Sequence, residues 1–174
     1  MYIIDWKFKK NPAKYFIQVG LATFTMSIIL MFMDVVEQTA LIASLGATVF
    51  TVFSMPCSFL CKLRSLLGGY MVGILSGTFF SWLKTVILDT KIIELETTAL
   101  GISGALAVGV AIFIMVVTNT EHAPAAGIAL GLVLNPWNIQ VLLFMIGAVL
   151  FVFTVKTIFG NYLINLIGKQ NGLG

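Results

Sequence analysis

Long uncharged apolar runs follow one another along the chain, and they restrict its fold more than any other feature. Only 10% of the 174 residues are charged and 59% are hydrophobic, whereas a soluble domain carries roughly 25% charge. A chain this small exposes much of its surface, so it has no room to hide so many apolar side chains from water. We exclude a soluble enzyme, a nucleic-acid-binding domain and a disordered chain, and predict an all-α bundle of membrane-spanning helices.

Charged and proline-containing stretches divide the apolar runs into six segments. A spanning helix needs about 20 largely apolar residues, and a carboxylate deep in the bilayer costs about 2.5 kcal/mol or more. The second and fifth segments are short, and the fifth has only about two thirds of the residues of a span. The predicted segments are 15–33, 39–55, 66–88, 97–117, 123–134 and 139–159.

The fifth segment decides the topology. As a re-entrant loop it gives five spans with the termini on opposite sides, whereas as a crossing it gives six spans with the termini together. Basic residues favour six spans with both termini in the cytoplasm, because cytoplasmic segments are enriched in Lys and Arg. Eight of the ten basic residues then lie inside, at Lys7, Lys9, Lys10, Lys14, Lys62, Arg64, Lys156 and Lys169.

The predicted single domain has two similar halves, 15–95 and 96–160, between an interfacial segment 1–14 and a cytoplasmic tail 161–174. In each half, a long span is followed by a short span rich in small residues, a proline turn and another long span. Gly46 lies ten residues before Pro56, and Gly127 lies nine before Pro136. Three spans per half predict inverted repeats, which in transporters place the site near interrupted helices. Two small-residue helices that simply pack closely remain the alternative.

The two short spans suggest how an anion is bound. If residues 40–43 and 122–125 are extended, two helix N-termini point toward the membrane midplane from opposite sides. Each presents backbone N–H groups and a partial positive charge. The predicted substrate-binding residues add hydroxyl, amide and imidazole groups to these termini. They are Ser44, Gly46, Ala47, Thr48, Asn119, Thr120, His122, Ala125 and Gly127.

Four ionisable residues lie near the predicted site. His122, the only histidine, and Glu121 are candidates for a proton or gating role, because ionisable groups inside a membrane are usually functional. An interfacial position is the alternative for His122, and Glu121 is also a candidate ion-pair partner of His122 or Arg64. Lys62 and Arg64 either set the topology or receive an anion at the inner mouth.

Other motifs add little chemistry. Gly69, Gly73 and Gly77 form a small-residue stripe, which predicts close packing within the bundle or a homodimer interface. Cys57 and Cys61 are too few for a metal site. The chain has no nucleotide-binding loop and no catalytic serine motif, so we expect no enzyme activity and no cofactor.

Two stretches of the sequence resemble the HPP family of small integral membrane proteins. LIASLGAT at 41–48, followed by Pro56 and LRSLLGGY at 63–70, is similar to the first family motif, and TNTEHAPAAG at 118–127 is similar to the second. The chain departs from the family pattern in four places. Ser44 replaces a proline, Tyr70 stands where a histidine often occurs, Ala123 replaces the first proline of His-Pro-Pro, and Ile128 replaces an alanine.

The resemblance implies a transporter of a small inorganic anion. Chloroplast and cyanobacterial-type members of the family are implicated in nitrite transport, so nitrite is the expected substrate and the plasma (inner) membrane the expected location. The expected partners are membrane lipid and a small anion, with no nucleic acid. Three alternatives stay open: an anion channel, a non-transporting sensor or assembly module, and an intramembrane enzyme using His122 and Glu121.

Overall fold

The computed structural model describes residues 6–33, 38–90 and 96–167, and every regular element in these ranges is a helix. Parts of the predicted terminal segments and interhelical loops, including Lys169, lie outside the described residues. The elements are α1 (Trp6–Lys10), α2 (Pro12–Leu30), α3 (Thr39–Ser54), the 3₁₀ helix η1 (Phe59–Cys61), α4 (Leu63–Asp89), α5 (Glu96–Thr118), α6 (Ala123–Leu134) and α7 (Ile139–Ile158).

Each predicted apolar segment overlaps one of the helices from α2 to α7, with ends that differ by up to three residues. The helix ends follow local chemistry. Pro12 opens α2, where the missing proline N–H costs no helical hydrogen bond. The Asn138 side chain caps α7 by accepting from the Val141 N–H at 3.0 Å. Helices α2, α4, α5 and α7 are long and apolar enough to cross a membrane, whereas α3 and α6 have 16 and 12 residues.

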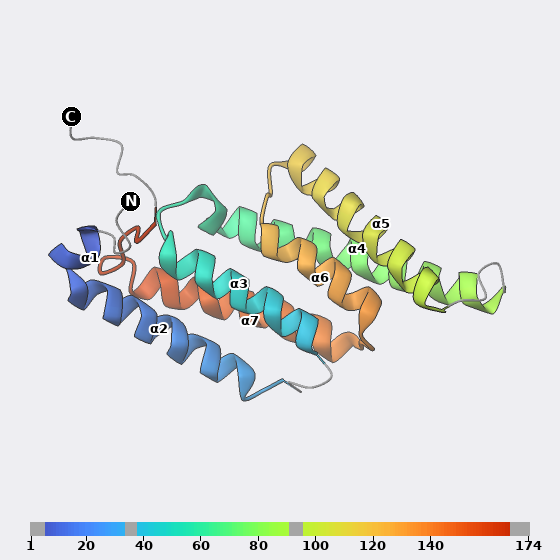
Figure 1. The fold of residues 1–174 in the computed structure, drawn as a ribbon, viewed down its shortest axis with the longest axis horizontal. Coiled ribbons are helices and arrows are strands. Elements are labelled where there is room, and N and C mark those ends of the chain that lie inside the picture. The colour runs from blue at the N-terminus through green and yellow to red at the C-terminus, as the bar shows by residue number, and fades with distance from the viewer. Residues whose placement is uncertain (1–5, 34–37, 91–95, 168–174) are drawn as a thin grey trace.

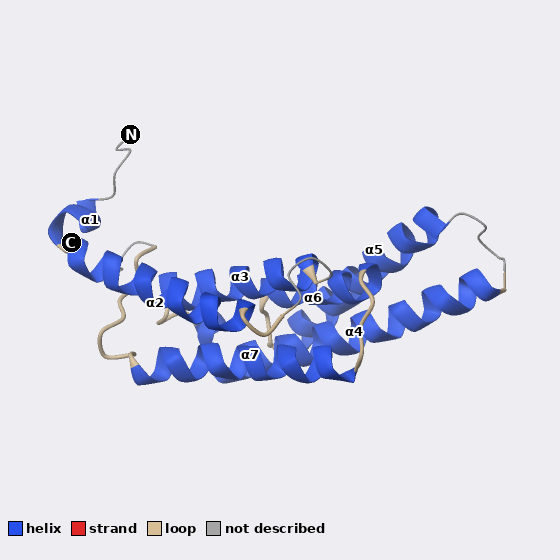
Figure 2. Cartoon of the chain, turned by 90° about the horizontal axis from the view of Figure 1, so that it is seen from below, coloured by secondary structure: helices blue, strands red, loops and turns tan. Residues whose placement is uncertain are grey.

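The helices from α2 to α7 run alternately back and forth along the long axis, so the start of α2 and the end of α7 lie at the same end (Figure 1). At this end, the Lys156 end, Gln18 Nε2 donates to the Phe53 and Ile164 carbonyls at 2.7 and 2.9 Å. At the opposite end, the Trp137 end, Gln38 Nε2 donates to the Pro136 carbonyl at 3.0 Å. The end of α4 and the start of α5 project beyond the other helices (Figure 2).

Helix α6 lies directly on the backbone of α4. A Cβ atom added at Gly69 would lie 2.7 Å from the His122 Cβ, and one at Gly77 would lie 2.8 Å from the Ala129 carbonyl oxygen. A Cβ at Gly73 would overlap the Ala125 carbonyl oxygen. The predicted glycine stripe therefore packs within the bundle and lets two helices that run in the same direction approach closely.

The opposite face of α6 packs against α3, which runs antiparallel to it. A Cβ at Gly127 would overlap the Ser44 hydroxyl, and one at Gly131 would lie 2.5 Å from Leu41 Cδ2. Gly46 faces α2 instead, with Met26 Cε as its nearest neighbour at 4.0 Å. Helix α6 is thus enclosed between α3 and α4, with glycine at both interfaces.

We predict that alanine destabilises the protein at Gly73 but not at Gly147. Gly73→Ala pushes a methyl group into the Ala125 carbonyl and should destabilise the protein by about 1–3 kcal/mol. The control, Gly147→Ala in α7, has open space at this position and should be neutral or stabilising by up to about 1 kcal/mol. Thermal unfolding in detergent measures both, and equal melting temperatures would contradict the close α4–α6 contact.

Candidate functional site: a buried polar cluster at a helix break

The chain leaves α5 through a tight turn that sets up the site. Asn119 has φ of 55°, and it is the one non-glycine residue with positive φ among those described. The N–H groups of Asn119 and Thr120 donate to the Val116 and Met115 carbonyls at 3.3 and 2.9 Å, which is the pattern of a Schellman motif. Residues 119–122, here called the break, then lead in non-helical conformation to His122, the extended N-cap residue of α6.

Three polar side chains from separate elements meet beside the break. Thr48 Oγ1 on α3 lies 2.8 Å from Tyr70 Oη on α4 and 3.0 Å from His122 Nε2. Thr48 Oγ1 also donates to the Ser44 carbonyl, one helical turn earlier, at 3.1 Å. Thr48 and Tyr70 are 0% exposed and His122 is 1% exposed. The bundle therefore holds a closed hydrogen-bonded cluster in apolar surroundings, where an unpaired polar group would be costly.

Two buried polar atoms next to the cluster lack hydrogen bonds. His122 Nδ1 is buried without a hydrogen-bond partner. Glu121 Oε2 is also buried without a partner. Beside them lies an apolar cavity of about 340 Å³ between α5 and α6, lined by Ile112, Met115, Val116, Glu121, His122, Ala123 and Ala126.

The structure gathers six of the nine predicted binding residues at the α3–α4–α6 crossing: Ser44, Thr48, Thr120, His122, Ala125 and Gly127. Ala47 is exposed, and Gly46 faces Met26. Residues four apart share a helix face, so Ser44 and Thr48 point toward α6 while Gly46 and Ala47 do not. Asn119 is exposed and serves the left-handed turn.

The predicted pair of facing helix N-termini is wrong. Residues 40–43 lie within α3, and α6 already begins at Ala123. Because α3 and α6 are antiparallel, their N-termini lie at opposite ends of the pair, with that of α3 near Pro136. Pro124 has no N–H group, and the Ala125 N–H donates to the His122 carbonyl at 2.8 Å. Polar side chains, rather than two helix termini, therefore provide the chemistry here.

Two basic side chains of α4, one near the site and one at the far end of α6, cap helix C-termini. Arg64 Nη2 donates to the Thr118 carbonyl at the end of α5 at 2.9 Å, and Lys84 Nζ donates to the Val133 carbonyl near the end of α6 at 2.9 Å. A cation is stabilised at a helix C-terminus by the partial negative charge there. Lys62 is exposed at the start of α4.

The two cysteines are free thiols, with Cys57 exposed and Cys61 buried. The Cys61 thiol donates to the Met55 carbonyl at 3.2 Å, and burial raises its pKa, so it stays protonated. Within the described ranges, no group of three or more His, Cys, Asp and Glu residues is placed to hold a metal.

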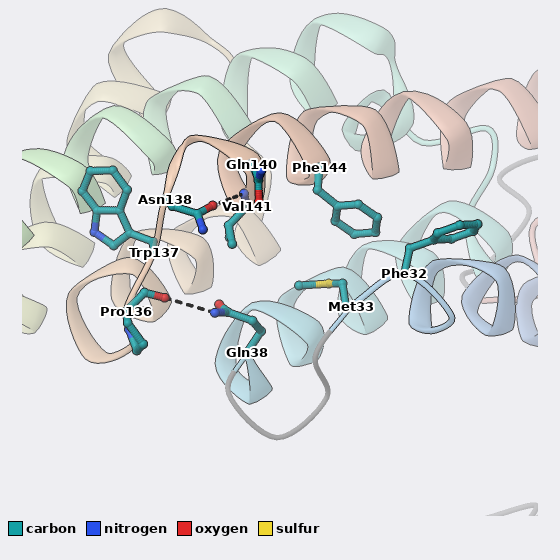
Figure 3. Close-up of a pocket in the computed structure, with 9 residues that line it drawn as sticks. All are labelled: Phe32, Met33, Gln38, Pro136, Trp137, Asn138, Gln140, Val141 and Phe144. Atoms are coloured by element: carbon teal, nitrogen blue, oxygen red, sulfur yellow. Dashed lines mark hydrogen bonds between the residues drawn. The ribbon is translucent and has the colours of Figure 1, made fainter.

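A second pocket, of about 400 Å³, opens at the Trp137 end (Figure 3). Gln38 lines it, donates to the Pro136 carbonyl, and leaves its own buried Oε1 without a partner. The predicted site residues include neither Gln38 nor Tyr70, although Tyr70 is one of the departures from the family pattern. Tyr70 follows a glycine pair on α4, but its contact with the Thr48 hydroxyl depends on the packing of two helices and cannot be seen in the sequence. Nothing in the sequence marks Gln38 except that it precedes a short helix.

The family comparison covers nearly the whole molecule: the description "HPP, transmembrane region" matches residues 7–170. The chain belongs to the HPP family. This HPP protein is therefore an integral membrane protein, in agreement with its apolar helices. No curated protein and no solved structure matches the chain.

We predict that removing the Thr48 hydroxyl destabilises the protein more than removing the Tyr70 hydroxyl. Thr48→Val leaves both Tyr70 and His122 without their shared partner, at about 1–3 kcal/mol for each stranded group. Tyr70→Phe deletes one hydrogen bond and should cost about 0.5–1.5 kcal/mol. Thermal unfolding in detergent ranks the stabilities of the two variants. A Thr48→Val protein that is more stable than the Tyr70→Phe protein would contradict the central position of Thr48 in the cluster.

Proposed function

We propose that this HPP protein transports a small inorganic anion, most specifically nitrite, and binds it at the cluster of Thr48, Tyr70 and His122. The observation that carries the proposal is the complete burial of this polar cluster among apolar helices. Buried polar groups in a membrane bundle are expensive, and they usually mark a substrate or ion pathway. The resemblance of the chain to family members implicated in nitrite transport supports the choice of substrate.

The break and α6 together are long enough to form a complete crossing. Arg64 binds the Thr118 carbonyl and Lys84 binds the Val133 carbonyl, so the stretch 118–133 runs beside α4 from the level of Arg64 to that of Lys84. At a rise of 1.5 Å per residue this part of α4 spans about 30 Å, the thickness of the hydrocarbon core. This length supports six crossings in two inverted halves.

The charges at the Lys156 end support an orientation with both termini in the cytoplasm of the plasma (inner) membrane. The start of α2, the start of α4 and the end of α7 meet there, and these elements carry Lys14, Lys62, Arg64 and Lys156. Basic residues are retained on the cytoplasmic side. In this orientation, Lys62 and Arg64 lie at the inner mouth, where they attract the anion.

Closure around the cluster favours a carrier over an open channel. The cluster side chains are at most 1% exposed, so the anion reaches them only when α6 shifts against α3 or α4. The glycine interfaces on both faces of α6 permit such a shift. Glu121 and His122 are the groups proposed to carry a proton or to control the opening.

A homodimer remains a proposal, but it requires a surface other than the glycine stripe of α4, which α6 covers. Helix α5 offers small exposed residues at Gly101, Ala105 and Gly109, and nothing lies within 4 Å of a Cβ added at either glycine.

We expect His122→Ala and Gly127→Leu to abolish saturable nitrite uptake into proteoliposomes. The first substitution removes the central ring, and the second drives a side chain into Ser44. Ala47→Leu places the same leucine side chain at an exposed position of α3 and should retain uptake. Size-exclusion profiles show whether each variant is folded. Wild-type uptake by folded His122→Ala and Gly127→Leu proteins would refute the proposed site.

A further inference from the structure

The hydrogens of the buried cluster can be counted. Thr48 Oγ1 has three partners: the Ser44 carbonyl at 3.1 Å, Tyr70 Oη at 2.8 Å and His122 Nε2 at 3.0 Å. A hydroxyl group has one hydrogen to donate and two lone pairs that accept. Because a carbonyl only accepts, the Thr48 hydrogen goes to Ser44, and Tyr70 and His122 both donate to Thr48.

The reverse arrangement is less favourable. If Thr48 donated to His122 Nε2, the neutral ring would carry its hydrogen on Nδ1, which has no hydrogen-bond partner. A buried N–H group without an acceptor is rarer in proteins than a buried lone pair without a donor. The ring is therefore protonated on Nε2 at rest, and Nδ1 holds a lone pair.

In this arrangement every hydrogen of the cluster is already donated. An anion is bound through hydrogen-bond donors, so the resting cluster has none to offer it. Within the cluster, His122 Nδ1 is the atom that can gain a hydrogen. We infer that the anion enters the cluster together with one proton, which is held on Nδ1 of His122, so that a monovalent anion is transported with one proton and without net charge. This inference rests on the proposed function and specifies its coupling ion.

The charges around His122 are compatible with a protonated ring. The charged groups on α4 and α5 lie toward the helix ends, and α3 has no charged or titratable group. The remaining titratable group on α4, the Tyr70 hydroxyl, is hydrogen-bonded to Thr48. Arg64 is bound to Thr118 and Lys84 to Val133, whereas Glu121 is adjacent in the chain and its Oε2 is unpartnered. The charged and titratable groups on the elements around His122 are Cys61, Arg64, Tyr70, Lys84, Asp89, Glu96, Glu121 and Lys156. Of these, Lys156 donates to the Cys61 carbonyl.

The single histidine makes the proton directly observable. Selective ¹⁵N-histidine labelling of the purified full-length protein reports on His122 alone. We expect NMR spectra near neutral pH to show a neutral ring protonated on Nε2, and added sodium nitrite to convert it to the doubly protonated form. Sodium gluconate at equal concentration should have no effect. A resting ring protonated on Nδ1, or a ring that stays neutral at saturating nitrite, would overturn the inference.

Proteoliposomes with a pH dye in the lumen separate this inference from the proposed function. After subtraction of the nitrite and proton entry into protein-free liposomes, we expect one proton to enter with each nitrite. The rate of uptake should be the same at two clamped membrane potentials, because no net charge moves. Nitrite uptake without luminal acidification would refute proton coupling and leave the transporter standing, whereas no nitrite uptake by the wild type would refute both.

Variants of Thr48 provide the matched comparison. Thr48→Val removes the hydroxyl that joins Tyr70 to His122, so we expect the loss of the Nε2-protonated resting state and of proton-coupled uptake. Thr48→Ser keeps the hydroxyl and should preserve both. Thr51→Val makes the same change on α3, where the Thr51 hydroxyl donates only to the Ala47 carbonyl, and should behave as wild type. Unchanged coupling in a folded Thr48→Val protein would contradict the role of this hydroxyl.

Discussion

The backbone contact between α4 and α6 is the constraint on which the rest of the structure depends. Side chains larger than hydrogen at Gly69, Gly73 and Gly77 would collide with His122, Ala125 and Ala129. Non-helical backbone at membrane depth is tolerated only where protein or water surrounds it. The glycine stripe brings α4 against Thr120 and His122 of the break, which is the protein cover that the proposed interrupted crossing needs.

Burial of Thr120 and His122 in the break in turn creates the chemistry. The Schellman motif at Asn119 ends α5 and directs the chain inward, so that His122 reaches Thr48 on the antiparallel helix α3. The hydroxyl of Tyr70 completes the cluster from α4. Each member comes from a different element, so a shift of α6 against either neighbour changes the hydrogen bonding of His122. The packing of the break against α3 and α4 therefore also forms the candidate binding site.

Much of the fold follows from the sequence because prolines and charges mark the helix ends clearly, and the limits of α6 agree with its apolar run. The site was only partly predictable. Residues 40–43 were expected to be extended before a helix N-terminus, but they are helical and form the first turn of α3. With the helix N-terminus expected just after residue 43, Gly46 and Ala47 were placed in the site, whereas in α3 they face away from α6. Tyr70 could be identified only as a departure from the family pattern, because its partner lies on another helix.

The central claim is that the chain crosses the membrane through the break and α6. Impermeant maleimide labelling of single cysteines from one side tests it directly, in a background in which Cys57 is replaced by Ser and Cys61 by Ala. The account predicts that Asn119→Cys and Gln140→Cys, both at exposed positions, react from opposite sides of the membrane. Reaction of both from the same side would make α6 re-entrant and contradict the account.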